Sequence, residues 1–297
     1  NMFTRFKAYT TGILLLLSLS VTSQDLDSLW AMRDTTLITG EQIDLQLKIA
    51  YAIHGTDIRE ALVMAKSALH EAEEIASVPW TAEAKLAIGI FYDFLGVNEE
   101  AAEYLMESYT SFVELKDSLK QAATLQQIGS TYFYLKQFGQ ALKKFTLLSE
   151  YGRELNDTSL IISGLNATAA VYGNTGKMDS ALIMFKEAHA LARKIGSLPQ
   201  EILAYYNMGD VYLYSGHRTQ ALEVFEDLEK YYNLEQNSPK HLSSLYNSMT
   251  KAYLEKGNIE MARDYSELTL EALNNNMRFS EYQEYFLHNI LCFIFIF

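Results

Sequence analysis

The sequence predicts an all-α solenoid of about six helix-turn-helix repeats with a period of 40 residues. Three observations predict this fold class: alanines that recur at constant spacing, other small and aromatic residues that keep the same period, and prolines that share one phase. The alanines are separated by 40 residues four times and then by 41 residues: Ala61, Ala101, Ala141, Ala181, Ala221 and Ala262. A fixed period of this length is typical of repeat arrays, in which each repeat packs on its neighbours.

Each repeat is counted from nineteen residues before its alanine, so that the alanine stands at position 20. The six repeats then begin at Gln42, Ala82, Ala122, Ile162, Ile202 and Ser243. Position 8 is glycine in three repeats (Gly89, Gly129 and Gly209) and alanine in a fourth. We expect it to face the alanine at position 20, because a larger side chain would overpack the crossing of two antiparallel helices. Tyrosine at position 11 and phenylalanine or leucine at position 24 predict core contacts, and glycine at position 15 predicts the end of the first helix.

The three prolines of the chain provide an independent check on this numbering. Pro79, Pro199 and Pro239 all fall at position 38, shortly before the next repeat. Proline is tolerated in the first turn of a helix and disrupts a helix interior. We therefore expect a new helix to begin at this position of the repeat.

The pattern resembles the tetratricopeptide repeat, whose helix pair carries small and aromatic residues at these positions. The resemblance is plainest in IGSTYFYLKQFGQALKKF (residues 128–145) and MGDVYLYSGHRTQALEVF (residues 208–225), and it covers about residues 42–275. The period is longer than the family's usual one, and the first and last repeats depart from the pattern, as terminal repeats do. The resemblance implies a right-handed α-solenoid whose first helices line a concave groove.

In that family the groove is lined from positions 2, 5, 9, 12 and 13 of each first helix. The residues there that the scaffold does not require are our candidates for a peptide-binding groove: Gln126, Ser130, Tyr134, Asn166, Asn174, Tyr206, Asp210, Tyr214, Asn247 and Lys251. An amide offers a donor and an acceptor to the backbone of an extended peptide, and tyrosine often anchors an interface. The alternative is that these residues are merely polar, water-facing positions of the helices.

The sequence predicts no catalytic, cofactor or metal site. The six histidines form no HExxH pair, and the sequence contains no glycine-rich phosphate loop or GxSxG turn. Cys292 is the only cysteine, so a disulfide framework is excluded. The formal net charge of −13, with no basic run, argues against nucleic acid as a partner.

The beginning of the chain predicts export. Residues 1–23 combine Arg5 and Lys7 with an apolar run at 12–21, which is typical of a signal peptide and too short to span a bilayer. We therefore expect the protein in the periplasm or cell envelope of a bacterium.

The rest of the chain divides into three segments. Residues 24–41 predict a short cap helix, with Trp30 packed on the first repeat, and a loop; the repeat array follows over 42–284. The apolar tail at 285–297 indicates a truncated membrane segment or a frame error. Membrane attachment is therefore expected only through sequence beyond residue 297.

These features favour an exported scaffold that binds a protein or peptide segment. The stretch that begins with DLDSLW (residues 25–30), followed by the repeats, also resembles the exported sensor region of bacterial signalling proteins, which implies the input region of a larger protein. The alternatives are a free-standing assembly factor of an envelope complex and, third, a solute-binding protein or enzyme.

Overall fold

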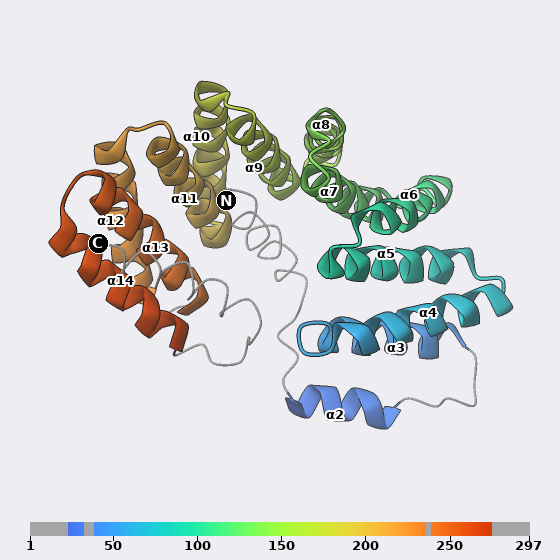
Figure 1. The fold of residues 1–297 in the computed structure, drawn as a ribbon. Coiled ribbons are helices and arrows are strands. Elements are labelled where there is room, and N and C mark those ends of the chain that lie inside the picture. Colours follow the sequence, from blue (N-terminus) through green and yellow to red (C-terminus); the bar gives the residue numbers. More distant parts are fainter. Residues whose placement is uncertain (1–22, 33–38, 236–238, 275–297) are drawn as a thin grey trace. The chain divides into compact units, whose positions relative to one another are not determined.

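The computed structural model describes residues 23–32, 39–235 and 239–274. Within these ranges the chain forms thirteen helices and no strand, and it is the all-α repeat solenoid that the sequence predicts (Figure 1). It divides into two compact units, Asn1–Thr175 and Gly176–Phe297, which are called the N-terminal unit and the C-terminal unit below. The predicted signal peptide up to residue 22 and the apolar tail lie outside the described residues.

The helices follow one another at the spacing that the repeat requires. The N-terminal unit contains α2 (Ser23–Met32), α3 (Gly40–Ile53), α4 (Ile58–Glu74), α5 (Val78–Leu95), α6 (Asn98–Glu114), α7 (Ser118–Tyr134), α8 (Phe138–Glu154) and α9 (Thr158–Asn174). The C-terminal unit contains α10 (Met178–Ile195), α11 (Leu198–Tyr214), α12 (Arg218–Glu235), α13 (Pro239–Glu255) and α14 (Ile259–Asn274). Within each unit, consecutive helices pack against each other.

The predicted signals for helix ends are confirmed. Pro79 and Pro199 lie in the first turns of α5 and α11, and α13 begins at Pro239. Gly96 ends α5 with a left-handed φ of 77°, as expected of glycine at position 15. In the third repeat Lys136 takes the same conformation, with a φ of 60°.

The close approach of the two helices differs in one respect from the expectation. A Cβ atom on Gly129 would lie 2.4 Å from the ring of Phe145, and one on Gly209 would lie 2.4 Å from the ring of Phe225. Position 8 therefore packs closely against the side chain at position 24, and a Cβ on Gly89 would also lie 3.2 Å from the carbonyl oxygen of Ala101 at position 20. The alanines are nevertheless buried, with at most 5% exposure, because the large ring needs small neighbours around it.

Two leucines pack the cap helix on the first repeats. Leu26 and Leu29 of α2 contact the hydrophobic core of the first repeats, whereas Trp30 is 37% exposed. Among the described helices, none is both long enough and apolar enough to span a membrane.

Candidate functional site

The predicted groove residues of the N-terminal unit lie on α7 and α9, two first helices that contact each other. Gln126, Ser130 and Tyr134 follow one another at four-residue spacing and so lie on one side of α7. Ser130 is buried, and its hydroxyl donates a hydrogen bond to the Gln126 carbonyl at 3.0 Å. Tyr134 is half-buried, with its ring edge-on to that of Phe133. We call these residues, together with Asn166, Ala170 and Asn174 of α9, the amide face.

The two asparagines on α9 have an unusual environment. Asn166 is 4% exposed, and the Nδ2 atom of Asn174 donates a hydrogen bond to the Ala170 carbonyl at 2.9 Å. The Oδ1 atoms of both amides are buried, and neither accepts a hydrogen bond from a described residue. A buried acceptor without a donor costs about 1–3 kcal/mol. The amide face therefore contains two buried oxygens, on residues about 12 Å apart along the helix axis, that lack a donor from the described residues.

The groove residues of the C-terminal unit lie on α11 and α13, which also contact each other. Tyr206, Asp210 and Tyr214 are spaced by four residues along α11. The Tyr206 hydroxyl lies 2.7 Å from Ser248 Oγ, and Ser248 Oγ in turn donates to Asp210 Oδ1 at 3.1 Å. Because the serine proton points to the carboxylate, the Tyr206 hydroxyl is the donor, and its one proton is shared between Ser248 Oγ and the Ser244 carbonyl, which lies 3.3 Å away. Tyr206 and Ser248 are both buried.

A second group on the same two helices carries charge. Lys251 Nζ lies 3.9 Å from the centre of the Tyr214 ring and 3.9 Å from Glu255 Oε1. The other carboxylate oxygen of Glu255 accepts a hydrogen bond from Arg218 Nε at 3.2 Å. The Lys251 and Glu255 side chains are about one third exposed, so this group lies at the surface. Ion pairs and cation–π contacts at such positions contribute about 0.2–1 kcal/mol each, so a ligand can compete for them.

We call Tyr206, Asp210, Tyr214, Ser248, Lys251 and Glu255 the charged face. Four predicted residues come together here in two pairs. Ser248 links Tyr206 to Asp210, and Lys251 contacts the ring of Tyr214 directly. Asn247 is half-buried on α13 beside Ser248 in the sequence. Ser248, Glu255 and Arg218 were not predicted. Ser248 stands at position 6, which is not a groove position of the family, so its role could not be inferred from the pattern.

The polar groups of both faces donate and accept hydrogen bonds. Among the described residues, no group of three or more His, Cys, Asp or Glu side chains could hold a metal ion. One histidine does contact a hydroxyl: His217 Nδ1 lies 3.1 Å from Ser215 Oγ. That hydroxyl, however, donates to the Val211 carbonyl at 2.6 Å and so closes the end of α11. The Ser215 hydroxyl therefore serves the end of its helix.

Comparison with known proteins agrees with this fold. Residues 160–233 match the family model described as the tetratricopeptide repeat. No curated protein sequence matches the chain. The fold places the chain in the class of helical repeat proteins, and within it residues 160–233 are similar to the tetratricopeptide repeat.

Several solved structures share the fold at low sequence identity. A Rap protein complexed with Competence and Sporulation Factor is 15% identical, with a TM-score of 0.70 over 97% of this chain and 78% of that chain. The Rap conjugation gene regulator of the plasmid pLS20, in complex with the Phr* peptide, is 16% identical, with a TM-score of 0.62 over 85% and 74%. A tetratricopeptide repeat protein from Parabacteroides merdae ATCC 43184 is 17% identical, with a TM-score of 0.61 over 97% and 98%.

Proposed function

We propose that this protein binds an extended peptide or protein segment along its first helices. The observation that carries the proposal is the pair of buried, unpaired amide oxygens of Asn166 and Asn174. An extended peptide presents backbone N–H groups at regular intervals, and it can place one at each oxygen once the two amide side chains turn toward the groove. The bound segment would thereby recover the hydrogen bonds that the free protein lacks.

Two further observations support a peptide as the ligand. The charged face offers the ammonium group of Lys251 and the carboxylate of Glu255 at the surface, which suits a chain with mixed polar side chains. Two of the structures with the same fold were solved as complexes, one with Competence and Sporulation Factor and one with the Phr* peptide. The likeness to them is one of fold, so it supports the mode of binding and not the identity of the ligand.

The proposal includes the setting in which the protein works. The apolar run at 12–21 with Arg5 and Lys7 supports export to the bacterial envelope, and the resemblance to sensor regions supports a role as the input part of a signalling protein. Expression of the gene with a C-terminal tag, fractionation of the cells and N-terminal sequencing test the export: cleavage near residue 23 is expected. A cytoplasmic product with an intact leader would contradict it.

We also propose that the protein acts by binding and not by catalysis. Repeat arrays generally present extended surfaces to partners and lack a catalytic centre of their own. Turnover of a phosphoprotein or ester substrate by the purified protein would contradict this part of the proposal.

The binding test exploits a natural precedent within the chain. Position 5 of the second repeat is Leu86, which is buried with 6% exposure, so leucine fits the fold at the position of Asn166. We expect peptides selected on the purified protein from a displayed library to bind the variant Asn166→Leu at least tenfold more weakly. Each lost hydrogen bond to a buried amide accounts for about 1 kcal/mol, and the leucine also blocks the approach of the backbone.

The matched control is Gln140→Leu, which replaces an exposed amide on α8 outside either face. This variant should bind the selected peptides as the unchanged protein does. Equal affinity of the Asn166→Leu variant and the unchanged protein would refute the amide face as the binding surface.

A further inference from the structure

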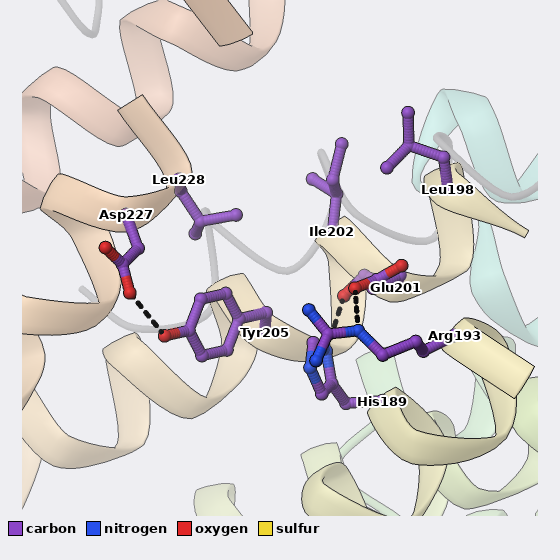
Figure 2. A pocket seen from close by; sticks show the side chains of 8 residues that line it. All are labelled: His189, Arg193, Leu198, Glu201, Ile202, Tyr205, Asp227 and Leu228. Carbon is purple, nitrogen blue, oxygen red and sulfur yellow. Dashed lines mark hydrogen bonds and ion pairs between the residues drawn. The ribbon is translucent and has the colours of Figure 1, made fainter. Parts of the chain in front are cut away.

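A pocket of about 240 Å³ lies in the C-terminal unit between α10, α11 and α12 (Figure 2). On α11 it is lined by Leu198, Glu201, Ile202 and Tyr205, which follow one i, i+3, i+4, i+7 stripe. The charged face uses a different stripe of the same helix, which begins at the neighbouring residue Tyr206. The pocket is therefore separate from the proposed peptide-binding surfaces.

The pocket has one polar side and one apolar side, as Figure 2 shows. On the polar side, Arg193 Nε donates to Glu201 Oε1 at 3.0 Å, and the Tyr205 hydroxyl donates to Asp227 Oδ2 at 3.3 Å. The ring of His189 lies beside Arg193, and its centre is 4.9 Å from that of the Tyr205 ring. The apolar side consists of Leu198, Ile202 and Leu228.

The charges of the lining favour a cation. The lining contains two carboxylates: Glu201 pairs with Arg193, and Asp227 pairs with Lys230, which lies outside the lining. Such surface pairs are worth only about 0–1 kcal/mol, so a cationic ligand can compete for the carboxylates. The chain as a whole carries a formal net charge of −13, which adds a long-range attraction for cationic partners. Aromatic ring faces beside carboxylates strengthen the same preference, because the face of a ring attracts a positive charge.

The size of the pocket limits the ligand to a single side chain or a small amine. Clefts that enclose drug-sized ligands measure about 300–1,000 Å³, and this pocket is smaller. A lysine or arginine side chain matches both sides, because its alkyl stem can lie along apolar residues while its charged end reaches a carboxylate.

The protein itself shows this type of contact at other places. Lys251 Nζ lies 3.9 Å from the centre of the Tyr214 ring, and Lys66 Nζ lies 5.1 Å from that of Tyr92. Asp227 also accepts a hydrogen bond from Lys230 Nζ at 3.0 Å through its other oxygen. An ammonium group is thus a partner that these tyrosines and this carboxylate take within the fold.

We propose that the pocket formed by His189, Arg193, Glu201, Tyr205, Asp227 and the adjoining leucine and isoleucine residues receives a lysine or arginine side chain of a partner protein. The stem of that side chain lies between Ile202 and Leu228, and its cationic end lies over the Tyr205 ring against Asp227. The pocket thereby adds a second contact point for a basic segment, independent of the amide and charged faces.

The test uses blocked tripeptides of the form acetyl-Ala-X-Ala-amide, in which X is lysine, arginine, norleucine or glutamate. Each is titrated into the purified protein while the imidazole carbon–proton signals of His189 are followed by nuclear magnetic resonance. We expect the lysine and arginine peptides to shift these signals saturably, the norleucine peptide to bind at least fivefold more weakly, and the glutamate peptide not to bind.

Variants of single residues test whether the lysine peptide binds in this pocket. Asp227→Asn should weaken the lysine peptide about three- to fivefold, because it removes the charge and keeps the shape. The matched control is Glu187→Gln, which changes the exposed carboxylate at the same repeat position on α10, outside the pocket lining; it should leave the affinity unchanged. The variant Asn166→Leu should also bind the lysine peptide normally, so failure of the peptide-binding proposal would not affect this result.

Four results would overturn the proposal. Equal binding of norleucine and lysine would make the pocket merely apolar, and tighter binding of glutamate would make Arg193 and His189 an anion site. An Asp227→Asn variant with full affinity would remove the assigned charge contact. Tighter binding of spermidine than of the lysine peptide would assign the pocket to a free polyamine instead of a protein side chain.

Discussion

The amide face and the charged face occupy equivalent positions of the repeat and yet satisfy their polar groups differently. On the amide face, Asn166 and Asn174 keep buried oxygens without a donor from the described residues. On the charged face, hydrogen bonds link Tyr206 to Ser248 and Ser248 to Asp210. The repeat therefore determines the positions of these side chains, whereas the residues of the neighbouring first helix determine whether their polar atoms form hydrogen bonds.

A similar contrast exists away from these two faces. Lys66, Tyr92 and Tyr104 in the N-terminal unit stand at the same repeat positions as Glu226, Tyr253 and Tyr265 in the C-terminal unit. In the first set the lysine lies over a tyrosine ring, whereas in the second Tyr253 donates its hydroxyl to Glu226 Oε1 at 2.8 Å. The tyrosines occupy the same repeat positions in both units. A positive side chain beside them contacts a ring face, whereas a negative one accepts a hydrogen bond from a hydroxyl.

The largest expected effect concerns the close contact between position 8 and position 24, which both units share. We expect Gly129→Val and Gly209→Val each to lower the free energy of unfolding by about 3 kcal/mol, because the new Cβ would lie 2.4 Å from a buried phenylalanine ring. Urea titration followed by circular dichroism measures this. Gly139→Val is the control, since a Cβ there meets no atom within 4 Å. Very different losses at Gly129 and Gly209 would break the idea of one shared scaffold.

The next prediction tests the hydrogen bonds that link Tyr206, Ser248 and Asp210 on the charged face. Ser248→Ala removes the link between Tyr206 and Asp210 and leaves both without that partner, in a site where Ser248 itself is fully buried. We expect the free energy of unfolding to fall by about 1–3 kcal/mol. A loss below 0.5 kcal/mol, roughly the effect of an ordinary surface substitution, would show that the network contributes little.

The opposite sign is expected on the amide face. Asn166→Leu removes a buried oxygen that lacks a donor and replaces it with the residue found at the same position of the second repeat. The midpoint of thermal unfolding should therefore rise, by the equivalent of about 1 kcal/mol. This gain should accompany the loss of peptide binding. A destabilised variant would instead indicate that the amide serves the fold.

The smallest effect concerns the tyrosine beside Glu226. Burial, and then the hydrogen bond to Glu226, raise the pKa of Tyr253 to about 12. A tyrosine in the unfolded chain has a pKa of about 10, so the folded state holds its proton longer. The stabilisation is present below pH 10 and is lost as the pH rises through about 12.

The variant Glu226→Gln sharpens this comparison, because it keeps an acceptor and removes the negative charge. We expect the pKa of Tyr253 to move down toward that of the free side chain, and burial to keep part of the rise. The difference in absorbance near 295 nm between each protein and its Tyr253→Phe derivative isolates this tyrosine. A pKa that does not move would show that burial alone determines it.

Much of the fold could be predicted because the signals are local and repeated. Proline in the first turn and glycine after the last turn act on the backbone of their own helix, so Pro79, Pro199 and Gly96 have the roles expected of them. The predicted contact of position 8 with position 20 is incomplete, because position 24 also packs there. Two side chains one helical turn apart, at positions 20 and 24, both point toward the facing helix, and only the structure shows that the ring of Phe145 fills the space above Gly129.

The candidate site was predictable only in part. The repeat frame led to Asn166, Tyr206, Asp210 and Lys251, because groove positions recur at known spacing. It could not lead to Ser248, whose contact with Tyr206 joins residues 42 positions apart in the sequence. It also gave no sign of the pocket beside Tyr205, which three helices enclose together.

The sequence by itself determined the helices, their pairing and the phase at which each side chain meets its neighbour, since these depend on periodicity and on residues that begin and end helices. Only the tertiary structure decided which polar groups are satisfied. That outcome depends on atoms brought together from separate helices at hydrogen-bonding distance, and a shift of one residue on either helix would change it. The unpaired oxygen of Asn166 and the paired hydroxyl of Tyr206 are therefore properties of the fold and not of the repeat pattern.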